Sequence, residues 1–400
     1  MVIIIGSGAG GGLLAMELAK FNIPVTIFEK GPYIESKDAL GCYEQSSEGL
    51  DLLKTSCVGG TTVVSCGNGV RVLQEEFSEF GIDLSSYYDC VEDLLYVHPL
   101  DDSHIGPGTQ LIIDSANELG LNATKMPKFI YEGKCIQCGN CAIGCPVDAK
   151  WTSKVFVDEA VNLGAKLICD AEVIELISEN DKIKGVKVLI DDKEEIFESE
   201  IVVLSAGAIG SPLLLRTVGI DAGHKLFMDP FVTVGGVLKD INFYKEVQMN
   251  ALIECNNFIL SPHFSSFLTN SLEDNSISNK DILSIMVKTP DEAKGYISED
   301  GEVVKINTIN DIRYLSEGAV TAGTILEKAG VDSTTISSTI YRGAHPGGSA
   351  ALGEFVDAHL ETIISGLFVV DASVLPISPG APPILCILAL SKRLSDYLKE

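Results

Sequence analysis

Basic residues are scarce in this 400-residue chain, where 29 Lys and Arg stand against 56 Asp and Glu for a formal net charge of -27. A surface of this sign repels a polyphosphate backbone, so nucleic acid is excluded as a partner. Hydrophobic residues make up 46% of the chain, which is enough for a large core. A chain of this length predicts two interleaved domains.

Long hydrophobic runs are also missing. Apolar stretches such as 201–206 and 366–370 are short and end at Gly or Asp, whereas a membrane-spanning helix needs about 20 apolar residues. The opening MVIIIGSG runs straight into a strand and a Gly-rich turn, without the charged segment, apolar segment and cleavage site of a secretion signal. The sequence therefore predicts a cytoplasmic protein without a membrane anchor.

A disulfide framework is not expected, because a reducing compartment keeps the 11 Cys as thiols. Seven are scattered, and we expect them to be small buried hydrophobic residues: Cys42, Cys57, Cys66, Cys90, Cys169, Cys255 and Cys386. The other four are clustered, and they are considered below.

The N-terminus carries a dinucleotide-binding pattern. An apolar strand at 2–5 is followed by GSGAGG at 6–11 and a helical pattern at 13–20. In such a turn Gly6 permits the sharp bend, Gly8 lets a pyrophosphate approach the backbone, and Gly11 lets the helix pack on the strand. A second strand ends at Glu29, where a carboxylate binds ribose hydroxyls and repels a 2′-phosphate. The pattern favours FAD or NAD over NADP and leaves those two open.

Four later segments carry further motifs. They are residues 58–69 (VGGTTVVSCGNG), 204–215 (LSAGAIGSPLLL), 345–353 (HPGGSAALG) and 367–376 (LFVVDASVLP). Together with the N-terminal turn they resemble, in the same order, the motifs of the glucose–methanol–choline (GMC) oxidoreductases, which use FAD. The resemblance covers roughly residues 1–75, 160–235 and 335–400.

The resemblance implies an α/β fold, in which a Rossmann-like FAD-binding domain with a parallel sheet is interleaved with an α+β substrate domain built on an antiparallel sheet. The expected FAD-binding domain comprises residues 1–75, 155–235 and 335–400, and the expected substrate or cap domain 76–124 and 236–334. Residues 125–154 would form an iron–sulfur insert. The apolar run at 282–287 is typical of a strand in the substrate-domain sheet.

The resemblance also implies which residues bind the cofactor. The turn and nearby amide that would line the flavin ring are Gly59, Gly60, Thr61 and Asn68, and the residue whose backbone would meet the adenine is Val173. The residues of the second signature and of the final strand are Ala206, Gly207, Asp371 and Ala372. Pro383 would open a last helix running to about Leu398, and the positive end of this helix would stabilise negative charge on the reduced flavin.

The clustered cysteines Cys135, Cys138, Cys141 and Cys145 read C-x2-C-x2-C-x3-C-P, the run of bacterial ferredoxins. Four thiolates at this spacing can hold one [4Fe–4S] cluster, with Gly139 and Gly144 letting the chain turn around it. Because only one run is present, Cys145 or a remote Cys must supply the fourth ligand.

Two alternatives to the cluster stay open. Four-cysteine zinc sites are common, although they usually consist of two separated C-x2-C pairs. Many GMC relatives carry a Gly-Cys-x-x-Gly-x-Lys-x-Ser segment, which residues 144–153 (GCPVDAKWTS) resemble, and they need not hold a cluster. A basic island could offset the charge of a cluster, dock an acidic electron carrier, or merely lie on a solvated loop: Lys125, Lys128, Lys134, Lys150 and Lys154.

By the resemblance, His345 is the base that takes the hydroxyl proton of an alcohol while hydride passes to flavin N5. The family's second active-site residue, a His or Asn, is replaced by Pro382, whose side chain neither donates nor accepts a hydrogen bond. The remaining histidines lack a motif and are expected at the surface or in loops: His98, His104, His224, His263 and His359.

These patterns favour an FAD-dependent dehydrogenase or reductase acting on a CH–OH group, rather than an oxygen-using oxidase. The small alcohol or carbonyl substrate would exchange a hydride with the flavin, and the cluster would pass single electrons to a ferredoxin-like carrier or a redox partner subunit. The alternative is an electron-transfer subunit that relays electrons within a complex and has no organic substrate.

Overall fold

The computed structural model describes residues 1–44, 51–271 and 277–400. Its main sheet has five parallel strands in the order β20-β11-β1-β2-β7. The strands are β1 (Val2–Ile5), β2 (Val25–Phe28), β7 (Lys166–Ile168), β11 (Ile201–Leu204) and β20 (Leu367–Val369). They are short and almost wholly apolar, as expected for a parallel sheet that is covered on both faces.

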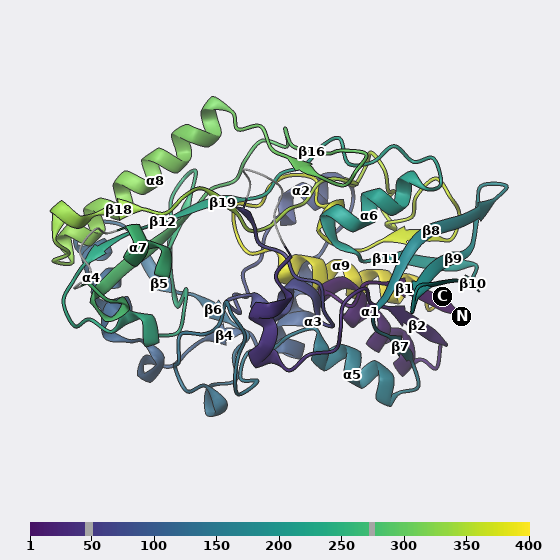
Figure 1. Cartoon of the computed structure of the whole chain (residues 1–400), viewed down its shortest axis with the longest axis horizontal. Coiled ribbons are helices and arrows are strands. Elements are labelled where there is room, and N and C mark those ends of the chain that lie inside the picture. The colour runs from purple at the N-terminus through teal and green to yellow at the C-terminus, as the bar shows by residue number, and fades with distance from the viewer. Residues whose placement is uncertain (45–50, 272–276) are drawn as a thin grey trace.

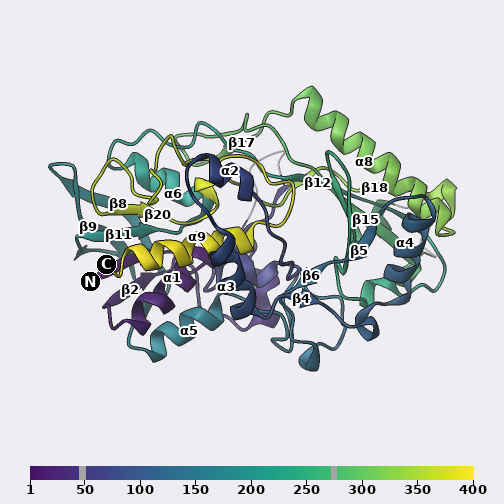
Figure 2. The same ribbon diagram turned by 180° about the vertical axis from the view of Figure 1, so that it is seen from behind.

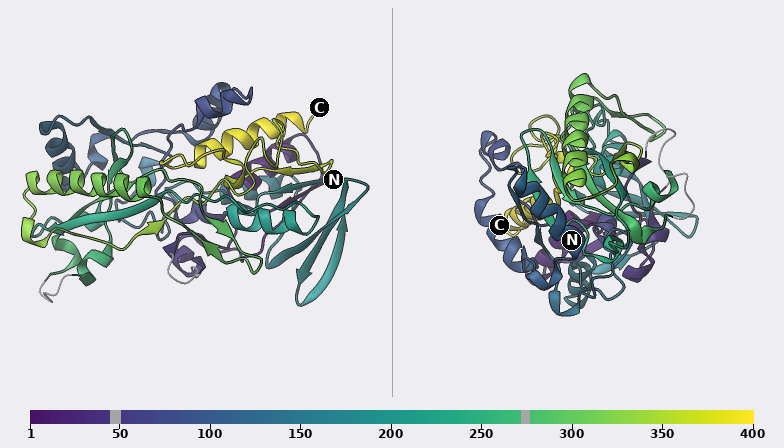
Figure 3. Two further views of the ribbon diagram at one scale, coloured as in Figure 1. Left: turned by 90° about the horizontal axis from the view of Figure 1, so that it is seen from above. Right: turned by 90° about the vertical axis from the view of Figure 1, so that its left-hand side faces the viewer.

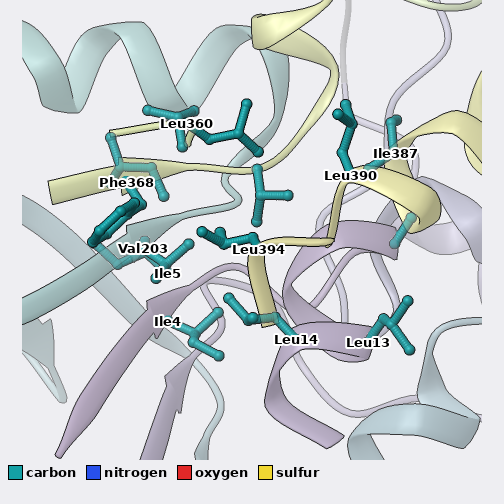
Figure 4. Close-up of a cluster of buried hydrophobic side chains, with 14 of the residues drawn as sticks. Ile4, Ile5, Leu13, Leu14, Val203, Leu360, Phe368, Ile387, Leu390 and Leu394 are labelled. Carbon is teal, nitrogen blue, oxygen red and sulfur yellow. The ribbon is translucent and has the colours of Figure 1, made fainter. Parts of the chain in front are cut away.

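Helices pack on this sheet and close the main core. They are α1 (Ala9–Lys20), α5 (Lys154–Asn162), α6 (Gly207–Arg216) and α9 (Ile384–Tyr397). Figure 4 shows Leu394 of α9 next to Ile4 of β1 and Leu14 of α1. The three-stranded antiparallel sheet β10-β9-β8 projects beside this core at one end of the molecule (Figure 3). Its strands are β8 (Ala171–Glu179), β9 (Lys182–Ile190) and β10 (Lys193–Glu198).

A second large sheet lies at the opposite end of the elongated molecule (Figure 1). It has eight strands in the path β3-β19-β12-β15-β14-β13-β5, with β18 paired to β12. All its pairs are antiparallel except β19 with β3. The strands are β3 (Asp51–Leu52), β5 (Ala123–Lys125), β12 (Pro230–Val237), β13 (Ala251–Glu254), β14 (Ile259–Pro262), β15 (Ile282–Lys288), β18 (Ser337–Ser338) and β19 (Arg342–Gly343).

The long helix α8 (Ile309–Lys328) and helix α4 (Pro107–Glu118) accompany this sheet (Figures 1 and 2). Shorter elements are α2 (Gln74–Glu79), α3 (Ser85–Leu95), α7 (Ser266–Ser271) and the strand pairs β4 (His98–Pro99) with β6 (Pro127–Lys128) and β16 (Tyr296–Ile297) with β17 (Val303–Val304). This arrangement confirms the predicted α/β fold with a parallel sheet and an antiparallel substrate-domain sheet.

Two details of the sequence interpretation are resolved here. The last helix begins after Pro383 and ends before Leu398, as predicted. The burial of the scattered cysteines was predicted too broadly: Cys57 and Cys386 are buried, but Cys90 is exposed and the other four are partly buried. Cys90 lies on α3, whose buried face is formed by Tyr88, Val91 and Leu95. None of the helices in the described part of the chain has the length and apolar character that crossing a membrane requires.

Candidate active site

The carboxyl ends of the parallel strands gather most of the predicted cofactor residues at one edge of the sheet. Gly6 follows β1, Glu29 follows β2, Ala206 follows β11, and Asp371 follows β20. In open parallel sheets this edge is where dinucleotides bind. We call it the carboxyl edge.

The first turn has the tight packing that its glycines were predicted to allow. A Cβ on Gly11 would lie 2.1 Å from the backbone oxygen of Gly6, so only glycine lets α1 pack against β1. A Cβ on Gly8 would meet nothing within 4 Å, so the backbone there faces open space. This opening at the start of α1 fits a pyrophosphate, because the amide groups of a helix N-terminus favour an anion.

Glu29 is buried and is held by neutral donors. Its carboxylate accepts hydrogen bonds from the Ser7 amide at 3.0 Å, from the Ser7 hydroxyl and from the Gly31 amide at 2.9 Å. Burial raises the pKa of this carboxyl, and the hydrogen bonds from Ser7 and Gly31 partly oppose that rise. No cation pairs with it among the described residues, so it suits an uncharged partner such as a ribose diol.

Asp371 is held in the same manner. Its carboxylate accepts hydrogen bonds from the Gly207 amide at 2.9 Å, the Ser373 amide at 2.8 Å and the Ser211 hydroxyl. Burial raises its pKa. The Ala372 carbonyl accepts a hydrogen bond from the Gly348 amide at 3.1 Å, which ties this segment to the one that carries His345.

The predicted flavin-ring turn meets the first turn directly. The Gly59 amide donates to the Ser7 hydroxyl at 3.0 Å, and a Cβ on Gly60 would lie 3.1 Å from the Cα of Gly8. Thr61 is exposed, whereas its neighbour Thr62 is buried and donates to the Gly59 carbonyl. Val173 lies in β8, paired with Val188.

Asn68 is buried beside Lys128, which the sequence indicated only as part of a basic island. Its side-chain oxygen accepts a hydrogen bond from the Lys128 ammonium at 2.6 Å. The same ammonium donates to the backbone oxygens of Cys66 at 2.9 Å and Gln248 at 2.8 Å. Lys128 is 0% exposed, and burial lowers its pKa to about 8.

His345 lies between two charged side chains that the sequence did not indicate. Its Nδ1 is 2.9 Å from Oδ2 of Asp229 and 3.1 Å from Nζ of Lys288. Asp229 is anchored in turn by the Gly380 amide at 3.0 Å and by the Ser378 hydroxyl. Burial, with the Lys288 charge adding to it, lowers the pKa of His345 to about 4, against the opposing effect of Asp229.

The other ring nitrogen of His345 is available. Nε2 forms no hydrogen bond with any described residue, and 21% of the side chain is exposed. An imidazole that is neutral at pH 7, held at Nδ1 and open at Nε2, can accept a proton there. The arrangement therefore suits a general base.

His263 was expected at the surface or in a loop, and it lies partly buried in the loop after β14. It follows β14 and lies beside the same group of side chains, with Nδ1 3.2 Å from the Thr233 hydroxyl. Burial, Arg342 and Lys288 lower its pKa to about 4. No sequence motif indicated this position of His263, because it results from the strand pairing of the eight-stranded sheet.

The cysteine loop, residues 135–146, has the turns that its two glycines were predicted to provide. Gly139 and Gly144 have φ values of +78° and +115°. A Cβ on either would lie within 2.0 Å of a backbone oxygen, that of Tyr244 or of Ser36. All four thiols are partly exposed. Burial raises the pKa of Cys135 and of Cys138, and the nearby Cys141 and Cys145 thiols add to it.

The thiols are not arranged as a finished metal site. Within residues 1–44, 51–271 and 277–400, no three His, Cys, Asp or Glu side chains are grouped so as to hold a metal ion. The cysteine loop is nevertheless backed by a second buried lysine, Lys150, which is 3% exposed and donates to the carbonyls of Thr62 at 3.0 Å and Val63 at 2.9 Å. Burial lowers its pKa to about 8. The interpretation that these lysines lie on a solvated loop is therefore wrong for Lys128 and Lys150.

The parallel sheet, its Gly-rich first turn and its buried acid after β2 define a dinucleotide-binding protein with an added antiparallel-sheet domain. Models of the GMC oxidoreductase family match residues 33–241 and 299–391. The chain belongs to the GMC oxidoreductase family, whose cofactor is FAD. The open space at Gly8 and the neutral donors around Glu29 agree with that cofactor.

Several relatives and solved structures resemble the whole chain. The protein MJ1450 of Methanocaldococcus jannaschii is 34% identical over 98% of this chain and 97% of its own. The long-chain-alcohol oxidase FAO4B of Arabidopsis thaliana is 24% identical over 100% of this chain and 67% of its own. The crystal structure of pyridoxine 4-oxidase from Mesorbium loti shares the fold with a TM-score of 0.76 at 14% identity, covering 99% of this chain and 98% of that one.

Proposed function

We propose that this protein is an FAD-dependent dehydrogenase or reductase that transfers a hydride between the carbon of a CH–OH group and flavin N5. Bound FAD supplies the two-electron acceptor, and the chain supplies its site. The residues for it are those of the carboxyl edge and the adjoining segments: Gly6, Gly8, Gly11, Glu29, Gly59, Gly60, Thr61, Asn68, Val173, Ala206, Gly207, Asp371, Ala372 and Pro383. An alcohol substrate agrees with the name of the Arabidopsis relative, a long-chain-alcohol oxidase.

The observation that carries this proposal is the environment of His345. Asp229 holds Nδ1 at 2.9 Å, and Nε2 is left without a partner among the described residues. As the hydride leaves the substrate carbon, the hydroxyl proton goes to Nε2. With Nδ1 protonated, Asp229 keeps the ring in the tautomer that has its lone pair at Nε2. An electron-relay subunit without a substrate has no need for a base held in this way.

We also propose that Cys135, Cys138, Cys141 and Cys145 hold a [4Fe–4S] cluster, which exchanges single electrons with a ferredoxin-like carrier or partner subunit. Two observations support it besides the spacing. The loop already turns at Gly139 and Gly144. Behind it, Lys128 and Lys150 bury two ammonium groups that form no ion pair with a described carboxylate. A thiolate-bound cluster is anionic and would supply the missing negative charge.

A dehydrogenase is favoured over an oxidase by this cluster, although similar proteins are named oxidases, among them pyridoxine 4-oxidase and formate oxidase. A cluster offers the reduced flavin an outlet for electrons other than oxygen. We further propose the division into domains that the sequence predicts, with residues 125–154 as the cluster insert. We also propose that the protein resides in the cytoplasm, which agrees with its 11 Cys being free thiols.

Metal and flavin analysis of anaerobically purified protein tests both cofactors. We expect one FAD and about four Fe per chain, with visible absorbance that bleaches on reduction. Cys141→Ser should lose the iron and keep the FAD, whereas Cys90→Ser, on the exposed face of α3, should keep both. Stoichiometric zinc without iron would refute the cluster. Peroxide formed at the rate of substrate oxidation in air would instead identify an oxidase.

A further inference from the structure

Lys288 is a buried ammonium group with almost no partners. It ends β15, is 2% exposed, and the one hydrogen-bond contact of its ammonium with a described residue is with Nδ1 of His345 at 3.1 Å. No described carboxylate lies within ion-pair distance of its Nζ. Lys305, buried nearby, shows the usual solution, because its ammonium pairs with Asp291 at 2.7 Å.

The contact with His345 does not satisfy Lys288 either. Nδ1 lies within hydrogen-bond distance of both Asp229 and Lys288, but one ring nitrogen either donates or accepts. Asp229 already accepts from Ser378 and Gly380 and is suited to receive the Nδ1 proton. In that tautomer the three N–H groups of Lys288 have no acceptor among the described residues.

The charges of Asp229 and Asp291 act on Lys288, but neither carboxylate lies within ion-pair distance of its Nζ. Its Nζ lies 5.6 Å from the centre of the Phe231 ring, which packs with Met249 and Met286 in an apolar cluster. The second cation at this ring, Arg342, lies 5.8 Å from the ring centre and is already paired with Asp51. Next to the base, the Lys288 ammonium therefore has no carboxylate among the described residues as a hydrogen-bond acceptor, although the charge of Asp229 acts on it from the other side of Nδ1.

We propose that Lys288 binds a carboxylate of the substrate, so that the substrate is a 2-hydroxy acid and its product the 2-oxo acid. This inference rests on the proposed function, because it places the hydroxyl at Nε2 of His345. Lys288 contacts Nδ1 of the same five-membered ring whose Nε2 would accept the hydroxyl proton, so an anion at Lys288 and the hydroxyl would lie within a short distance of each other. A carboxylate on the carbinol carbon meets that requirement.

The reaction balances without another reactant. In the oxidising direction the hydroxyl proton goes to Nε2 of His345 and the carbinol hydrogen leaves with its electron pair for the flavin. The C–O single bond becomes a carbonyl. The carboxylate keeps its charge throughout, and Lys288 neutralises it in both states.

Matched substrates test the inference. Anaerobic flavin reduction is measured with lactate against 1,2-propanediol and with glycolate against ethylene glycol, pairs that differ in the carboxylate. We expect the parent to favour the acids by roughly 10–100-fold in kcat/KM, the worth of a charged hydrogen bond. Lys288→Gln should lose this preference. Lys239→Gln, which removes a mostly exposed ammonium 3.8 Å from Asp281 in the same domain, should retain it.

Binding of oxalate to the oxidised holoenzyme, followed by the flavin absorbance, gives a second readout that needs no turnover. It should be lost in Lys288→Gln and partly kept in Lys288→Arg. Equal use of acids and diols, or a preference that survives Lys288→Gln, overturns the inference while the dehydrogenase stands. No response to oxalate or to either acid overturns it as well. Oxalate binding that depends on Lys288, with no alcohol or acid reducing the flavin, removes the dehydrogenase and leaves the anion site.

Discussion

At the carboxyl edge of the five-stranded sheet the buried charges are the carboxylates of Glu29 and Asp371, each surrounded by amide and hydroxyl donors. Toward the eight-stranded sheet there are buried carboxylates as well, such as those of Asp229 and Glu246. This region differs in that it also buries the ammonium groups of Lys128, Lys150 and Lys288, whose Nζ atoms contact uncharged carbonyl, amide and imidazole groups. Neither these ammonium groups nor the carboxylates of Glu29 and Asp371 form an ion pair among the described residues.

This difference indicates which kind of ligand each region can bind. A buried charge without a counter-charge costs several kcal/mol unless hydrogen bonds or a ligand compensate it. Carboxylates satisfied by neutral donors suit the hydroxyl groups of a ribose. Ammonium groups facing neutral acceptors suit an anion, either a thiolate-bound cluster or a substrate carboxylate.

The largest effect is expected from a substitution of His345, which lies between the two regions. His345→Ala should slow flavin reduction by substrate about 10²–10⁴-fold, the usual contribution of a positioned proton acceptor. Electron exchange between photoreduced flavin and the cluster should survive, because it involves no substrate proton. His359→Ala, an exposed histidine stacked on Tyr397, serves as the control. A parent-like rate in His345→Ala would remove this residue from the mechanism.

The carboxylate region is tested by Glu29→Gln. The amide keeps the shape but loses the charge that strengthens hydrogen bonds to ribose hydroxyls, so we expect FAD to bind roughly 10–100-fold more weakly. Equilibrium binding of FAD to the apoprotein measures this. Glu175→Gln, which alters a partly exposed ion pair between Glu175 on β8 and Lys187 on β9, should bind FAD like the parent. Unchanged affinity in Glu29→Gln would end the ribose assignment.

The ammonium region is tested by Lys150→Met. Removing a buried positive charge beside the cysteine loop destabilises the more negative, reduced state, so the midpoint potential of the cluster should fall by on the order of 50 mV. Redox titration followed by electron paramagnetic resonance measures it. Lys134→Met removes an exposed lysine that directly precedes Cys135, and water screens its charge. Equal shifts in the two variants would contradict a special role for the buried ammonium.

The smallest effect concerns pH. Because burial and Lys288 lower the pKa of His345 to about 4, the limiting rate of flavin reduction in the parent should stay constant on acidification until the pH approaches that value. There the imidazole takes up a proton and can no longer accept one. Lys288→Gln removes a repelling cation, so the pKa rises and the loss of rate should begin at higher pH. Superimposable profiles would show that the Lys288 charge does not act on His345.

The parts that the sequence predicted well are those whose pattern is local. The turn at Gly6–Gly11 and the helix after Pro383 each follow from residues a few positions apart. Asp229 and Lys288 were missed because they lie 116 and 57 positions from His345. Lys288 ends an apolar strand, where a lysine usually marks the step into solvent. Only the pairing of β15 with β12 and β14 shows that this lysine is covered on both sides.

The two glycine contacts of the cysteine loop bear on how the protein matures. The backbone of Tyr244 lies so close to Gly139, and that of Ser36 so close to Gly144, that neither glycine leaves room for a Cβ. Ser36 precedes the cysteine loop in the chain, and Tyr244 follows it. During synthesis the loop therefore obtains its full support only after Tyr244 has emerged from the ribosome. For the proposed cluster, this order would place iron loading after the synthesis of Tyr244, because the four cysteines would before then lie on an unsupported segment.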